Sequence, residues 1–400
     1  MQNYTILKEL GSGAYGIVYK AQHKQTQQIV ALKQIHQKTN SWNLAKNQIE
    51  LRSFQKIKPN LNIVTLYEAF REKDGTFYFV FEFVDAGSLY DLLVKNQKLS
   101  ARMPEVEIRQ ICFQVLQGLD HMHSYDFMHR DLKPENVLLQ HSTEGIQITG
   151  MSTVIPKIAD LGCAKETRQR VPIHSLYAGT RWYRSIELLM KDQSYGKPND
   201  VWAIGCVFAE LFTNKCLFPG NSELDQINMI LGQLGPLYDE EWPQYQQLAS
   251  KMNFVSVTGG STTRYQTGAS HNRIKQKLTQ QIKFASDEAM DCLSYMLELN
   301  PDRRCTTDQL LNHKWFQKDT TKFARPPSNQ QYQQHESITR TKEKIAQMQS
   351  QQVVNEDFGD YQFESKRSLS NQKQVSHAHI NAKDLIKKEE DVNLDFGDFE

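Results

Sequence analysis

The spacing of apolar residues divides the chain into two parts with different periods. Up to about residue 83, short apolar runs are rich in β-branched and aromatic residues and are separated by Gly, Asn or Asp-Gly, which predicts strands. One polar segment, residues 41–56, interrupts these runs and has the character of a helix. Residues 4–83 are therefore predicted to form a small β-rich lobe.

From about residue 86 onward, the apolar spacing becomes helical. One amphipathic stripe recurs at intervals of three and four residues, at Ile108, Cys112, Val115, Leu119 and Met122. Residues 201–211 are apolar almost all round, as in a helix buried inside a domain. Residues 293–299 resemble the end of another helix, which Asn300-Pro301 would stop. A strand-rich part followed by a helical part predicts an α+β fold with two lobes.

The composition changes again after Phe316. Residues 318–400 are rich in glutamine and poor in aliphatic side chains, and we expect them to form a disordered tail. Within this tail, Asp-Phe-Gly-Asp occurs twice, at 357–360 and 395–398. Two interpretations stay open: a coincidence in a biased segment, or a duplicated acidic-aromatic peptide that docks partner proteins.

The composition excludes several classes of protein. Lys plus Arg is 47 and Asp plus Glu is 46, and this balance argues against a global electrostatic footprint for nucleic acid or for an anionic membrane. No stretch approaches the ~18 consecutive apolar residues of a membrane span. The first residues lack an apolar leader, and position 2 is not the glycine that myristoylation requires. Six scattered cysteines without a C-x-x-C pair indicate a reducing compartment, so we expect a soluble intracellular protein.

A glycine-rich run near the N-terminal end has the pattern G-x-G-x-x-G-x-V, from Gly11 to Val18. Glycines suit a backbone that bends tightly and approaches phosphate oxygens. A dinucleotide fingerprint would need a helix after the glycines and an acidic residue about 20 positions later. A strand follows instead, and residues 33–36 are Lys-Gln-Ile-His. The run therefore predicts a phosphate-binding loop, with a plain β-hairpin as the alternative.

Two charged residues are candidates for nucleotide binding beside such a loop. Lys33 ends the apolar strand 30–33, where its ammonium can reach the α- and β-phosphates of a nucleotide. Glu50 lies on the polar helix and can orient this lysine through an ion pair. Taken alone, each would be an ordinary solvated side chain.

The strongest motif is His-Arg-Asp-Leu-Lys-Pro-Glu-Asn at residues 129–136. Asp131 and Asn136 lie in one rigid loop and can face one site, with a carboxylate to accept a hydroxyl proton and an amide oxygen to hold Mg²⁺. Lys133 can neutralise charge on a transferred phosphoryl group. Downstream, an Asp-Leu-Gly turn supplies Asp160, which we expect to be the principal Mg²⁺ ligand.

With these four elements in order, residues 4–316 resemble the eukaryotic protein kinases. The resemblance implies a catalytic domain over 4–317, with lobes 4–83 and 84–317, that binds ATP and Mg²⁺ and phosphorylates protein substrates. The metal loop reads D-L-G instead of the usual D-F-G, but its aspartate is retained. The D-F-G at residue 357 lies in the tail with no strand before it, and we interpret it as a decoy. Lys133 and Thr180 are typical of the serine/threonine class.

The resemblance also assigns roles residue by residue. The expected catalytic residues are Lys33, Glu50, Asp131, Lys133 and Asn136, and the expected metal ligands are Asn136 and Asp160. The expected ATP contacts are Leu10, Gly11, Ser12, Gly13, Ala14, Tyr15, Gly16, Val18, Ala31, Lys33, Phe81, Glu82 and Val84. Phe81 would be the gatekeeper, and 82–84 the hinge that hydrogen-bonds adenine. Asp200 would brace the catalytic loop, and Glu187 would pair with Arg304.

Finer motifs resemble the group that holds the mitogen-activated and cyclin-dependent kinases, and most closely its male-germ-cell-associated and ciliary branch. These motifs are the segments 180–184, 217–220, 223–227, Ser41-Trp42, Trp242-Pro243 and 252–254. Three features depart from the pattern. Ser185-Ile186 replaces Ala-Pro, which makes proline-directed specificity less certain. Ser175-Leu176-Tyr177 replaces T-x-Y, and residues 141–154 form an extended loop that we interpret as a surface insertion.

Regulation is expected at Ser175 and Tyr177, the predicted activation-loop phosphosites. Arg130, Arg181 and Arg184 could hold a phosphate there by bidentate hydrogen bonds. The alternative is an ordinary loop tyrosine beside solvated arginines. The resemblance further implies an upstream activating kinase and a monomer in the cytoplasm, cilium or nucleus. An alternative for the whole chain is a pseudokinase scaffold that recruits partners through its tail.

Overall fold

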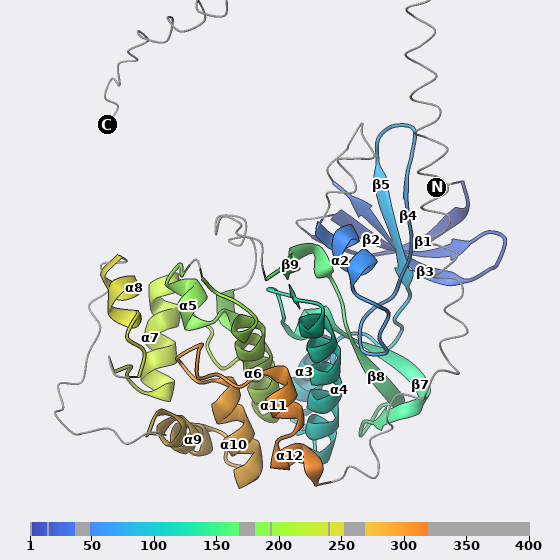
Figure 1. The fold of residues 1–400 in the computed structure, drawn as a ribbon. Coiled ribbons are helices and arrows are strands. Elements are labelled where there is room, and N and C mark those ends of the chain that lie inside the picture. The colour runs from blue at the N-terminus through green and yellow to red at the C-terminus, as the bar shows by residue number, and fades with distance from the viewer. Residues whose placement is uncertain are drawn as a thin grey trace, which may run out of the picture. The chain divides into compact units, whose positions relative to one another are not determined.

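The computed structural model describes seven segments of the chain: residues 2–13, 16–36, 49–167, 181–192, 194–238, 241–251 and 269–318. The chain divides into two compact units, residues 1–341 and 342–400, and every described residue belongs to the first. Strands dominate its N-terminal part and helices the remainder (Figure 1). The predicted two-lobed α+β fold is therefore confirmed. The expected tail, 318–400, lies outside the described residues except for Lys318.

The N-terminal lobe is built on one antiparallel five-stranded sheet with the order β1-β2-β3-β5-β4. Its strands are β1 (Tyr4–Gly13), β2 (Gly16–His23), β3 (Ile29–Ile35), β4 (Leu66–Arg71) and β5 (Phe77–Glu82). Alternate residues of β5 enter two separate apolar clusters, because side chains in a strand point to opposite faces. Phe77, Phe79 and Phe81 pack on one face, and Tyr78 and Val80 pack on the other.

Helix α2 (Ile49–Lys56) belongs to the same lobe (Figure 1). Its Phe54 lies against the cluster that contains Phe81, with ring centroids 5.4 Å apart. Residues 49–56 of the predicted helix are thus confirmed, whereas 41–48 lie outside the described residues. With α2 packed in this way, Glu50 in its first turn points toward the site described below.

The C-terminal lobe is mainly helical. Its helices are α3 (Leu89–Leu99), α4 (Glu105–Ser124), α5 (Ile186–Leu189), α6 (Pro198–Thr213), α7 (Glu223–Leu234), α8 (Tyr245–Lys251), α9 (Ala269–Gln281), α10 (Asp287–Met296), α11 (Thr307–Leu311) and α12 (Lys314–Gln317). The predicted stripe of α4 is fully buried, and α6 is buried all round from residue 199 to 211. Both predictions are confirmed, and these two helices lie in one large core.

The predicted end of α10 is wrong by three residues. The helix ends at Met296, and Leu297 closes it with a hydrogen bond from its amide to the carbonyl of Leu293. Leu297 and Leu299 are fully buried. The apolar run therefore reflects core burial after the helix, and not a continuation of the helix itself.

The extended loop expected at residues 141–154 is also wrong, because most of it is strand. Strands β7 (Val137–Gln147) and β8 (Thr153–Ile158) form a long hairpin. Ile146, Ile148 and Val154 are buried in the core of the C-terminal lobe, so the hairpin is held by packing despite its polar composition.

Short elements complete the region between the lobes. They are strands β6 (Phe127–Met128) and β9 (Lys165–Glu166), and the 3₁₀ turns η1 (Pro134–Asn136), η2 (Leu161–Cys163) and η4 (Arg181–Tyr183). β6 pairs with β9, and the loop between β6 and η1 carries the predicted catalytic aspartate. No helix in the described segments combines the length and the apolar character needed to cross a bilayer.

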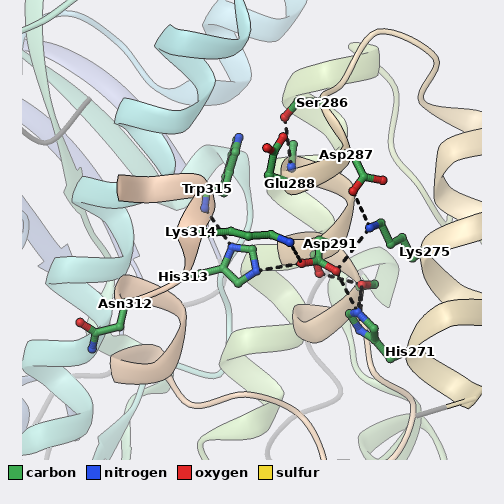
Figure 2. Close-up of polar contacts among 12 residues, drawn as sticks. His271, Lys275, Ser286, Asp287, Glu288, Asp291, Asn312, His313, Lys314 and Trp315 are labelled. Atoms are coloured by element: carbon green, nitrogen blue, oxygen red, sulfur yellow. Dashed lines mark hydrogen bonds and ion pairs between the residues drawn. The ribbon is translucent and has the colours of Figure 1, made fainter. Parts of the chain in front are cut away.

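A polar cluster around Asp291 joins three helices at the far end of this lobe (Figure 2). The Asp291 carboxylate lies 2.8 Å from the Lys314 ammonium of α12 and 3.1 Å from His271 of α9. His313 lies 3.3 Å from the same carboxylate, and Lys275 lies 3.5 Å from it. A carboxylate that is only 14% exposed thus holds α9, α10 and α12 together.

Candidate active site

Three charged side chains from separate elements meet at the border of the two lobes. The Lys33 ammonium of β3 lies 2.8 and 3.0 Å from the two carboxylate oxygens of Glu50. It also lies 2.8 Å from Oδ1 of Asp160, just before η2. The spacing in sequence is 17 and 127 residues, so only the fold brings these groups together.

Two carboxylates around one ammonium leave a local excess of negative charge. Burial alone would lower the pKa of the Lys33 ammonium, but the charges of Glu50 and Asp160 outweigh burial and raise this pKa above its ordinary value. Burial would likewise raise the pKa of Asp160, but Lys33 outweighs it and lowers this pKa. At neutral pH, Asp160 is therefore ionised, as a metal ligand must be.

Two side chains of the motif at residues 129–136 contact the Asp131 carboxylate. Lys133 Nζ lies 3.0 Å from Oδ2 of Asp131, and Asn136 Nδ2 donates to the Asp131 carbonyl at 2.7 Å and to Oδ2 at 3.1 Å. The buried His129 ring contacts the carbonyl of Ala159 at 2.9 Å. These contacts fix the carboxylate of Asp131 and tie its loop to the residue that precedes Asp160.

Asp200 in the first turn of α6 holds this loop through hydrogen bonds to its backbone. Its Oδ1 accepts from the Arg130 amide and its Oδ2 from the His129 amide, each at 2.8 Å. The His123 ring lies 2.9 Å from Oδ2. Burial alone would raise the pKa of Asp200, but His123 and the amide donors lower it. Arg130 is held at φ 71°, a left-handed conformation that costs free energy and persists because the carboxylate pins both amides.

The ligand chemistry of the site fits Mg²⁺ that arrives with a nucleotide. Asp160 offers carboxylate oxygens, and the two hydrogen bonds from Asn136 Nδ2 leave Oδ1 as the free acceptor of that amide. The described segments contain no group of three or more His, Cys, Asp or Glu that could hold a metal by themselves. Mg²⁺ commonly takes one or two protein oxygens and completes its shell with phosphates and waters. The pair Asp160 and Asn136 suits that arrangement.

The glycine-rich run includes the end of β1 and the start of β2, where Gly13 pairs with Gly16. A Cβ on Gly16 would lie 2.0 Å from the carbonyl of Gln34 in β3, so strand packing requires this glycine. A Cβ on Gly11 or Gly13 would meet nothing within 4 Å, so the protein itself does not require these two. Open space beside two glycines is what close approach of a phosphate would use.

The other residues expected around a nucleotide lie on the same sheet. Val18 pairs with both Gly11 and Lys33, and Ser12 and Leu10 are exposed on β1. Ala14 and Tyr15 lie outside the described residues.

An apolar surface lies next to this hairpin, formed from both lobes. Ala31 and Val84 are partly buried against the cluster that contains Phe81. Leu138 of β7 and Ala159 pack against the same cluster, and sequence reasoning missed both. A signal was available for both, because Leu138 lies two residues after Asn136 and Ala159 directly precedes Asp160.

The predicted phosphosites Ser175 and Tyr177, with Thr180, lie outside the described residues. The arginines expected to face them are partly engaged elsewhere. Arg130 donates to the Cys163 carbonyl and, at 3.0 Å, to the Tyr195 hydroxyl. Arg181 donates to the Asn221 carbonyl at 2.8 Å.

The segment after these residues is anchored by buried polar contacts. Ser185 Oγ donates to Asn199 Oδ1 at 2.8 Å, so the serine that replaces alanine is fully satisfied. Glu187 and Arg304 form a bidentate ion pair at 2.7 and 3.1 Å, as predicted. Both side chains are almost completely buried, at 1% and 0% exposed.

Comparisons with known proteins agree with this geometry. A model of the protein kinase domain matches residues 4–316. Serine/threonine-protein kinase ICK of Rattus norvegicus is 38% identical over 317 residues, which cover 79% of this chain and 45% of the relative. Serine/threonine-protein kinase MAK of Mus musculus is 39% identical over 317 residues, 79% of this chain and 46% of the relative. Cyclin-dependent kinase F-4 of Oryza sativa subsp. japonica is 34% identical over 319 residues, 79% of this chain and 62% of the relative. The chain therefore spans about half the length of the first two relatives.

Proposed function

The chain belongs to the protein kinase family, and from this premise we propose that it is an active serine/threonine kinase that transfers the γ-phosphoryl group of ATP to protein hydroxyls. The observation that carries the proposal is the complete charged set at one site. Lys33 contacts both Glu50 and Asp160, while Lys133 contacts Asp131. A set without Asp131 would favour nucleotide binding without efficient transfer.

Each residue has a role that follows from its contacts. The carboxylate of Asp131 accepts the proton of the attacking hydroxyl, because Asn136 and Lys133 fix its orientation. Lys133 then neutralises charge on the phosphoryl group in transit. Lys33 holds the α- and β-phosphates and is kept in place by Glu50. Mg²⁺, held by Asp160 and Asn136 when bound, supplies further neutralisation of the phosphate charge.

The adenine would lie against the apolar surface of Ala31, Phe81, Val84 and Leu138. The backbone of the hinge, residues 82–84, would supply its hydrogen bonds. Gly11 and Gly13 leave space beside the phosphates. Leu10 and Val18 would cover the ring from the sheet.

The alternative is a pseudokinase that acts as a scaffold through its tail. Radiolabel transfer from ATP to a basic protein by the full-length chain separates the two, with Asp131→Asn as the matched control. We expect transfer by the wild type, and at least a tenfold lower kcat in the variant, which is ~1.4 kcal/mol of transition-state stabilisation. Nucleotide binding by both proteins with transfer by neither would favour the scaffold.

The regulatory part of the proposal concerns Tyr177. Arg181 Nε is buried and has no hydrogen-bond partner among the described residues, so this guanidinium keeps an unused donor. A phosphate on Tyr177 adds roughly −1.5 to −2 of charge and could use that donor. Active enzyme should then carry phosphotyrosine at this residue, and Tyr177→Phe should lower activity several-fold. Full activity with unmodified Tyr177 in mass spectrometry would leave Ser175, or neither residue, as the switch.

Two finer features rest on the branch resemblance. Proline-directed specificity is weakened by Ile186, which starts α5 where proline is usual, and a peptide library with and without proline after the acceptor tests it. Placement at a cilium is tested by imaging the tagged full-length chain in ciliated cells. We further propose that the tail, 318–400, recruits partners and is dispensable for peptide phosphorylation.

A further inference from the structure

The side chain of the first hinge residue points to the C-terminal lobe and is almost removed from solvent. Glu82 ends β5, and its Oε1 lies 2.9 Å from the Lys157 ammonium of β8. The two side chains are 16% and 8% exposed, respectively. The contact spans 75 residues of sequence and joins a strand of one lobe to a strand of the other.

The same carboxylate also ties down the hinge from its own lobe. Glu82 Oε1 accepts from the Thr65 amide at 2.8 Å, and the Glu82 amide donates to the Thr65 carbonyl at 3.0 Å. The start of the hinge is therefore fixed to the segment before β4 whether or not Lys157 is present. Lys157 adds a side-chain connection from Glu82 to β8, beside the backbone bonds that Asn62 and Val64 make with Ile158.

β8 leads directly to the candidate metal ligand. Asp160 follows Lys157 by three residues. The strand is held by backbone bonds on both sides of Ile158, whose amide donates to the Asn62 carbonyl at 2.8 Å and whose carbonyl accepts from the Val64 amide at 2.9 Å. Lys157 and Asp160 therefore lie on one short segment, and the position of Lys157 bears on that of Asp160.

An ion pair that is largely shielded from water costs desolvation free energy. Apolar side chains of similar size often give equal or greater stability, so such pairs are more readily explained by a requirement for one specific arrangement. Here the arrangement concerns the two ends of the nucleotide site. The hinge lies at the adenine end, and Asp160 with Lys33 lies at the phosphate end.

We propose that Glu82 and Lys157 are positioning residues that fix the hinge at the correct distance from Asp160, so that adenine and phosphates are held at the same time. The inference rests on the proposed ATP-dependent function. It predicts a specific signature: loss of the pair weakens ligands that contact both ends and spares ligands that contact only the hinge.

The test is calorimetric titration of the full-length chain with adenosine and with Mg²⁺-ATP. Lys157→Met should weaken Mg²⁺-ATP about tenfold, within the range of coupling between contacting residues. Adenosine affinity should change by no more than about twofold, because the bonds between Glu82 and Thr65 remain. Lys157→Arg keeps the cation and should restore most of the ATP affinity.

Two further variants distinguish positioning from general destabilisation. Arg273→Met breaks another partly buried ion pair, with Glu241 at 2.8 Å, that lies within the helical lobe, so it should leave the ratio of the two affinities unchanged. Glu82→Gln keeps an acceptor for Thr65, and combined with Lys157→Met it should weaken Mg²⁺-ATP no more than Lys157→Met alone.

Equal losses for adenosine and Mg²⁺-ATP in Lys157→Met would overturn the inference, because the pair would then support only the hinge. Unchanged affinity for both ligands would overturn it as well. If wild type binds neither ligand, the proposed function fails instead, so the two failures are distinguishable.

Discussion

Replacing Glu187 by glutamine should strongly destabilise the C-terminal lobe. Glu187 forms a bidentate pair with Arg304, and both side chains are shielded from water. The substitution keeps size and one acceptor but removes the negative charge. Arg304 then remains charged in the core, because its guanidinium cannot lose a proton near neutral pH.

The size of the expected loss in unfolding free energy depends on the contacts that Arg304 retains in the variant. Arg304 keeps hydrogen bonds to three backbone carbonyls, those of Pro198 at 2.8 Å, Glu298 at 2.9 Å and Leu299 at 3.4 Å, and its guanidinium lies 5.1 Å from the centroid of the Trp202 ring. Removal of one partner from a buried pair commonly costs 3–5 kcal/mol, and the retained carbonyls place this site near the lower end, at about 3 kcal/mol. A loss of that size should lower Tm by about 5 °C in a domain this large.

Urea unfolding of the purified chain, followed by tryptophan fluorescence, measures the change. The matched control is Asp287→Asn, which removes the carboxylate from an ion pair with Lys275 at 2.8 Å. The Asp287 side chain is 74% exposed, so this variant should change the unfolding free energy by less than about 0.5 kcal/mol. Adding Arg304→Met to Glu187→Gln should recover part of the loss, since no uncompensated charge remains. A loss below about 1 kcal/mol for Glu187→Gln, or strictly additive losses, would refute the reasoning.

Three other predictions concern single carboxylates. Asp160→Asn should abolish turnover and leave the fold intact, since it removes a candidate metal ligand without creating a cavity; circular dichroism and a kinase assay check both. Burial raises the pKa of Glu210 to about 7, and the hydrogen bond from the Tyr183 hydroxyl opposes this only weakly. The folded state therefore favours the protonated carboxyl, and the unfolding free energy falls as the pH rises from 4.5 to about 7. Glu210→Gln should therefore flatten the fall in unfolding free energy across that window. Burial alone would raise the pKa of Asp291, but Lys314 and His271 lower it, so its stabilising contribution is present above pH ~4 and lost in more acidic solution. Asp291→Asn should cost about 2 kcal/mol at neutral pH and less near pH 3, as measured by urea unfolding.

The contacts that could be predicted from the sequence are those marked by a motif with fixed internal spacing. The loop 129–136 brings Asp131 and Asn136 together because only five residues separate them. The pair of Lys33 and Glu50 could be proposed only beside the phosphate-binding loop, since no short motif links these residues and their contact depends on how α2 packs on the sheet. The structure shows this pair and also places the Lys33 ammonium 2.8 Å from Asp160.

Other features left no local pattern to detect. The hairpin of β7 and β8 is rich in Ser, Thr and Gly. Its buried apolar residues lie in two groups, Val137, Leu139 and Ile158 at one end and Ile146, Ile148 and Val154 at the other, and the residues between Leu139 and Ile146 are all polar or glycine, so no clear alternation results. The pair between Glu82 and Lys157 joins two lobes, so neither residue's neighbours in sequence indicate the other. Such contacts depend on tertiary packing, which a single sequence does not encode in any short window.

The central claim, that this chain is an active serine/threonine kinase, is tested most directly by a peptide array incubated with the purified full-length protein, Mg²⁺ and γ-labelled ATP. The array should carry matched peptides with Ser, Thr or Tyr as the only acceptor, and Asp131→Asn should be assayed beside the wild type. Label on the Ser and Thr peptides, absent from the Tyr peptides and at least tenfold weaker with the variant, is the predicted result. Label no stronger with wild type than with Asp131→Asn would contradict the account.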